Sequence, residues 1–114
     1  MQPSEPNDHG VLEPGHREFV ATRGRAFAAV TIALCEDGLY RSGAELHYAL
    51  GGFGFPITTH SPGYATLDAA RMAGIECLLR AWHTPFPSDP DSVRAELSDM
   101  RSQIEDRLRQ PSLL

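Results

Sequence analysis

Histidine and cysteine side chains are the first candidates for chemistry in this sequence, because both bind transition metals when they lie close together. The histidines are His9, His16, His47, His60 and His83. No two of them have the separation of two to four positions that usually marks a zinc site. His47 and His60 belong to neighbouring expected strands and could meet, with Glu45 or Cys35 as a further ligand. Solvated histidines are the simpler interpretation, so we expect no metal site and no cofactor.

Nucleophilic side chains are the second candidates. Cys35 and Cys77 are the only cysteines, form no CxxC pair and fall in apolar runs, where thiols typically behave as small buried hydrophobic groups. Ser42 and Ser61 lack the local motif of a catalytic serine. The glycine-rich stretch 51–54 lacks the lysine of a phosphate-binding loop and is better explained as a turn. We therefore name no catalytic residue. A pair of carboxylates beside a cleft stays open, but an enzyme is the less favoured interpretation.

Charge and hydropathy limit the classes of partner. The 114 residues carry ten arginines, no lysine and a net charge of −5. Nucleic-acid backbones and anionic membranes both need a basic face, so neither is expected as the main partner. The N-terminus has no signal-peptide pattern, and no apolar run is long enough to span a membrane. We expect a small acidic cytoplasmic protein.

Three strand-like runs precede the first helical pattern. Residues 1–18 show no apolar period and are expected to form a disordered tail ahead of a single domain at 19–110. Phe19 and Val20 could begin a short element, which Gly24 would interrupt. The strands are expected at about 26–35, 39–50 and 53–60, with Asp37-Gly38 and Gly51-Gly52 as turns. Pro56 lacks an amide hydrogen, so the third strand should lie at a sheet edge or carry a bulge.

Two helices are expected after these strands, at about 67–82 and 90–109. Thr66 is a suitable N-cap for the first helix, and Pro90 suits the first position of the second. The three prolines of 83–91 indicate a loop between them. The predicted fold class is therefore α+β: an antiparallel three-stranded meander, a helix packed on one face of it, and a C-terminal helix.

The order of three strands and an alanine-rich helix, from Phe27 to Trp82, resembles that of double-stranded RNA-binding domains. The resemblance implies a basic helix start that contacts phosphates. This helix begins instead with Leu67, Asp68 and Ala69, which places an acidic residue where such domains have basic residues. The resemblance therefore argues against RNA binding.

The first helix carries two apolar stripes when successive residues are placed 100° apart. The small-residue stripe consists of Ala70, Gly74, Cys77 and Ala81, and we expect it to face the sheet, with Gly74 at the closest approach. The large-residue stripe consists of Met72, Ile75, Leu79 and Trp82. Four large apolar side chains in water would exceed what a monomer usually exposes, so the large-residue stripe needs a partner.

The second helix offers one possible partner for this stripe. Its apolar residues form a narrow seam of Val93, Leu97, Met100, Ile104 and Leu108, spaced 4, 3, 4 and 4. Packing within one chain is the simpler interpretation. The alternative is that one or both helices pack across a homodimer or against another protein.

Three functional hypotheses follow. The leading one is a protein that acts through protein–protein contacts by these helix surfaces, with a homodimer as one form. The second is a small-molecule-binding or enzymatic module with a pocket near Phe53, Phe55, His60 and Tyr64, a stretch that supplies both apolar and polar groups. The third is an acidic inhibitor of a nucleic-acid-binding protein, which is suggested by charge and size.

Overall fold

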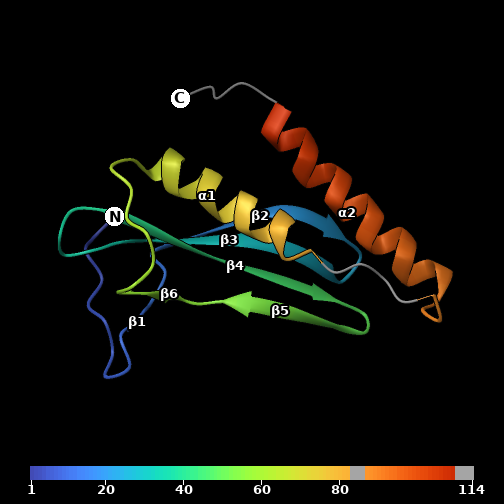
Figure 1. The fold of residues 1–114 in the computed structure, drawn as a ribbon, viewed down its shortest axis with the longest axis horizontal. Helices are drawn as coiled ribbons and strands as arrows, with labels where there is room; N and C mark the ends of the chain where they lie inside the picture. Colours follow the sequence, from blue (N-terminus) through green and yellow to red (C-terminus); the bar gives the residue numbers. More distant parts are fainter. Residues whose placement is uncertain (83–86, 110–114) are drawn as a thin grey trace.

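Both helices lie on one face of a four-stranded antiparallel sheet (Figure 1). The computed structural model describes residues 1–82 and 87–109. Its elements are β1 (Val11–Leu12), β2 (His16–Arg23), β3 (Ala26–Leu34), β4 (Tyr40–Tyr48), β5 (Gly51–Phe55), β6 (Ile57–Thr58), α1 (Leu67–Arg80) and α2 (Asp91–Arg109). The main sheet has the order β2-β3-β4-β5, and β1 pairs with β6 in a separate two-stranded sheet. The α+β class, with two helices and antiparallel sheets, is confirmed.

The expected three-stranded meander is wrong, because β2 adds a fourth strand in front of it. A β-bulge between Phe19 and Ala21 shifts the register, so that both Val20 and Ala21 are buried and the alternation of the strand is lost. Gly24 does not interrupt an element. It is the first residue of the two-residue hairpin loop between β2 and β3, and its φ of +58° suits that position.

The expected third strand is divided at Pro56. Residues 51–55 form β5 at the edge of the main sheet, and Ile57 and Thr58 leave that sheet to pair with β1. The turn between β4 and β5 consists of Ala49 and Leu50 rather than of the expected glycines, since Tyr48 pairs with Gly51. Proline ends β5 because it cannot donate to a ladder.

The N-terminal segment lies against the sheet. Residues 1–18, for which the sequence indicates a tail, contain β1 and the first three residues of β2. The amide of Ser4 donates to the Leu34 carbonyl at 2.8 Å. Leu12 and Ile57 bury Ala33 and Cys35 on the sheet face opposite the helices. We call residues 1–15 together with 56–60 the arm. The arm covers one end of this second face.

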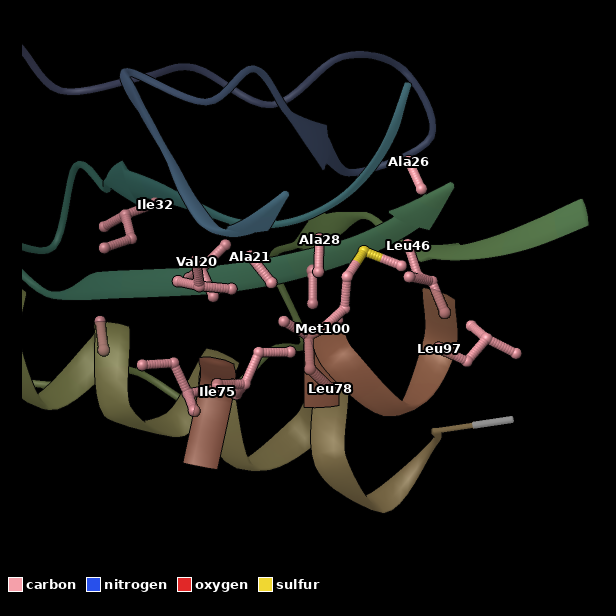
Figure 2. Close-up of a cluster of buried hydrophobic side chains, with 14 of the residues drawn as sticks. Val20, Ala21, Ala26, Ala28, Ile32, Leu46, Ile75, Leu78, Leu97 and Met100 are labelled. Atoms are coloured by element: carbon pink, nitrogen blue, oxygen red, sulfur yellow. The ribbon is translucent and has the colours of Figure 1, made fainter. Parts of the chain in front are cut away.

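The main core lies between the sheet and the helices. Figure 2 shows Val20, Ala28 and Leu46 of the strands directed toward Leu78 of α1 and Met100 of α2. α1 begins as expected, with Thr66 Oγ1 accepting a hydrogen bond from the Ala69 amide at 3.1 Å. This core therefore has contributions from both helices.

Candidate functional site

The seam of α2 and the large-residue stripe of α1 both belong to this core. Within the seam, Val93, Leu97, Met100 and Ile104 are buried, and Leu108 is partly buried against the same cluster. In the stripe, Ile75 is buried, while Met72, Leu79 and Trp82 pack partly buried against it. The structure thus brings the predicted contact residues together within one chain. Their apolar surface is largely occupied there.

The expected pocket near the third strand is only partly assembled. A hollow of about 380 Å³ has Phe55, Pro56, Pro62 and Tyr64 in its wall. Phe53 packs against the main core instead, and His60 is exposed in the turn after β6 and does not line the hollow. Tyr64 and Phe55 are therefore the two predicted residues that the structure brings to one site.

Polar groups that sequence reasoning did not assign line the same hollow. Glu76 and Arg80 are exposed residues of α1, and Cys77 beside them is partly buried. Ser42 and Ser61 come from β4 and the turn after β6. Across residues 1–82 and 87–109, Glu76 and Arg80 form no ion pair or hydrogen bond with a side chain. Their spacing of four positions on α1 favours a mutual ion pair, but that pair is not formed. Their charges are available to a ligand.

The face of the sheet opposite the helices carries a second candidate site. We call Arg17, Phe19, Phe27, Glu45 and His47 the open-face strip. The Phe19 and Phe27 rings meet edge to face, with centroids 5.3 Å apart, and the Phe27 and His47 rings stack at 4.7 Å. Phe19 keeps 47% of its surface exposed. The strip thus forms an aromatic row across β2, β3 and β4.

Charged groups border this aromatic row. The Arg17 guanidinium lies 5.1 Å from the Phe19 ring centroid and 5.3 Å from that of Phe27, within the range of a cation–π contact. Arg17 also forms an ion pair with Glu45, and His47 Nε2 lies 3.8 Å from the second oxygen of Glu45. Glu45 therefore lies between Arg17 and His47, the two ends of the strip.

A groove of about 400 Å³ continues from the strip to the arm. Its floor includes Thr31, Glu45 and Gly54, and its walls are residues 11–14 and 55–57. The polar face of β4 was predictable from the alternation of its residues. The row itself was not, because it depends on the register that sets Phe27 opposite His47. Arg17 and Phe19 were not predicted either, because they belong to β2, which was not among the strands expected from the sequence.

Arg41, on β4, joins the turn before this strand to the turn after β6. Its Nη1 and Nη2 donate to the two carboxylate oxygens of Asp37 at 3.1 and 3.0 Å, and its Nε donates to the Ser61 carbonyl at 2.9 Å. The hydrogen bonds from Arg41 hold the pKa of Asp37 below its ordinary value, and the same pair raises the pKa of Arg41. Arg41 also borders a hollow of about 180 Å³ beside Cys35. We assign this group a structural role.

The remaining chemical candidates stay apart. In the described ranges 1–82 and 87–109, no three histidine, cysteine, aspartate or glutamate side chains are grouped as metal ligands would be. Both Cys35 and Cys77 are free thiols. His83, with the first part of the expected 83–91 loop, lies outside the described residues. No helix in the described part of the chain is long and apolar enough to cross a membrane.

Comparison with protein-family models, with curated proteins and with solved structures finds no match.

Proposed function

We propose that this protein is a protein-binding module that engages its partner through the open face of its sheet. The observation that carries the proposal is the open-face strip, in which an exposed Phe19, a half-buried Phe27 and an arginine lie together on one sheet face. Aromatic and arginine side chains dominate the binding energy of protein interfaces. The helix seam is less suited to this role, because its side chains are packed inside the chain.

The groove beside the strip favours an extended segment with a basic side chain. Glu13 and Glu45 are its two charged lining residues, and both are acidic. The net charge of −5 attracts a basic partner over longer distances and speeds its association. An arginine of the partner could replace Arg17 at Glu45 and stack on the aromatic row. A nucleic-acid-binding protein, which carries a basic surface, would meet these requirements.

Site-specific photo-crosslinking in the native cell tests this proposal. A benzophenone amino acid is placed at Phe19 on the open face, and in a matched variant at Arg101 on the exposed side of α2. We expect the position 19 variant to give a discrete product with one partner, and Glu45→Gln in the same background to reduce its yield. Identical products from both positions, or no discrete product from position 19, would contradict the proposal.

The hollow beside α1 supports a second candidate function, the binding of a small molecule. Its unpaired Glu76 and Arg80 carry opposite charges, and Phe55, Pro56 and Pro62 supply an apolar wall. This combination suits a small zwitterion with an apolar body, such as an aromatic amino acid. Alkylation of Cys77, which is more exposed than Cys35, provides the measurement. We expect L-phenylalanine to slow it in the wild type but not in Arg80→Ala; no protection in the wild type would reject this candidate.

A further inference from the structure

The two edges of the main sheet differ in how far their outward backbone groups are covered. At the β2 edge, the side chain of Gln103 accepts from the Thr22 amide at 3.1 Å and donates to the Thr22 carbonyl at 2.9 Å. Arg107 donates to the carbonyls of Val20 and Phe19 at 3.0 and 3.2 Å. Side chains of α2 thus occupy backbone groups that would otherwise pair with another strand.

Among residues 1–82 and 87–109, no helix lies along the other edge, β5 (Figure 1). Tyr48 and Gly51 flank a two-residue loop and therefore form a hydrogen-bonded pair. Along the rest of β4 and β5, non-hydrogen-bonded and hydrogen-bonded pairs then alternate. The backbone amides and carbonyls of Phe53 and Phe55 consequently form hydrogen bonds with β4. Those of Gly52 and Gly54 point away from β4. In the part of the chain that the structure describes, no side chain bonds to these outward groups.

β5 lacks two of the features that usually protect a free edge, namely charged side chains and a bulge. Natural edge strands carry charges or bulges that discourage pairing. No residue from 48 to 59 is charged, and the register from Tyr48–Gly51 to Ala44–Phe55 runs without a shift. Phe55 is 40% exposed and Leu50, in the adjoining turn, is 58% exposed. Pro56 and the short length limit how far pairing could extend, but they leave Gly52 and Gly54 accessible.

We propose that a second copy of this chain pairs its own β5 with this edge, antiparallel, about a two-fold axis beside Phe53. The sequence Gly52-Phe53-Gly54 reads the same in both directions, so Gly52 of each copy opposes Gly54 of the other and exchanges two hydrogen bonds with it. Phe55 then opposes Gly51, which leaves room for its ring. Because the strand is uncharged, the pairing sets no like charges opposite each other.

The resulting dimer has one continuous sheet of eight strands. A two-fold axis perpendicular to the sheet keeps both open faces on the same side. The dimer would therefore present two open-face strips together and bind a repetitive partner more tightly than one copy can. The pairing does not depend on the strip having a partner.

The test compares Gly54→Pro with Gly54→Ala. A Cβ at position 54 meets no atom closer than the Ala44 carbonyl oxygen at 3.9 Å, so the alanine side chain fits. Only proline removes the outward amide hydrogen. By sedimentation equilibrium, we expect the wild type and Gly54→Ala to dimerise, and Gly54→Pro to raise the dissociation constant about tenfold or more, since two symmetric hydrogen bonds are lost.

If Gly54→Pro does not fold, hydrogen exchange of the backbone amides in the wild type tests the same pairing. Exchange at Gly52 and Gly54 should slow as protein concentration rises, while exchange at Thr22, on the capped edge, should not change. A wild type that stays monomeric at high micromolar concentration overturns the inference. Equal dimerisation of the proline and alanine variants, or concentration-dependent protection outside β5, also overturns it.

Discussion

At the scale of single residues, Gly74 shows how closely α1 approaches the sheet. A Cβ added at this position would lie 2.5 Å from Cγ1 of Val30 and 3.4 Å from the Gly43 carbonyl oxygen. A glycine inside a helix ordinarily costs about 1 kcal/mol relative to alanine. Here the close packing of α1 against β3 and β4 requires it.

We therefore expect Gly74→Ala to lower the free energy of unfolding by about 1–3 kcal/mol, because overpacking outweighs the gain in helix propensity. Urea denaturation followed by circular dichroism measures the change. The control is the same substitution in a Val30→Ala background, where the clash is removed and Gly74→Ala should be neutral or stabilising. An equal loss in both backgrounds would show that the contact with Val30 is not the cause.

At the scale of elements, α2 serves β2 in two ways. Its apolar seam packs on the core, and its polar side chains Gln103 and Arg107 bond to the backbone of the strand edge. The bulge in β2 sets Val20 and Ala21 together toward the core beneath α2. A strand with a weak sequence pattern is thus held by two helix residues that lie more than 80 positions later in the chain.

The edge contact of Gln103 gives the second prediction. Gln103→Met keeps most of the side-chain volume but removes both hydrogen bonds to Thr22, so we expect a loss of about 1–2 kcal/mol in unfolding free energy and faster amide exchange at Thr22. Arg101→Met, on the exposed side of α2, serves as the control and should leave exchange at Thr22 unchanged. If the two variants behave alike, the hydrogen bonds do not protect the edge.

At the scale of the whole molecule, the sheet and both helices share one core. Leu97 of α2 is 1% exposed and belongs to the same cluster as Leu46 of β4 and Leu78 of α1. We expect Leu97→Ala to lower the free energy of unfolding by about 2–5 kcal/mol in a single cooperative transition. Ser98→Ala, at an exposed neighbour, should change it by less than about 0.5 kcal/mol.

This third prediction also separates the two roles considered for the seam. Sedimentation at several concentrations shows whether Leu97→Ala changes the oligomeric state. A variant that unfolds as the wild type does but associates less would place the seam in an interface instead of the core.

Much of the fold was predictable because its signals are local. The Thr66 cap, the Asp37-Gly38 turn, the alternation in β4 and the periodicity of both helices are each set by neighbouring residues. β2 and the arm were not predictable, since a bulge, a hairpin glycine and short strands carry weak local patterns. Of the four residues predicted for the pocket, only Phe55 and Tyr64 line the hollow beside α1.

The sequence by itself determined the class of fold, the two helices and the apolar surfaces that each helix must bury. Only the tertiary structure decided what buries them, which edge of the sheet is capped and which stays free, and that Phe19, Phe27 and His47 form one row. The physical reason is that helix periodicity, caps and turns depend on interactions over a few residues. Strand register, edge protection and face coverage depend on contacts between segments far apart in the chain.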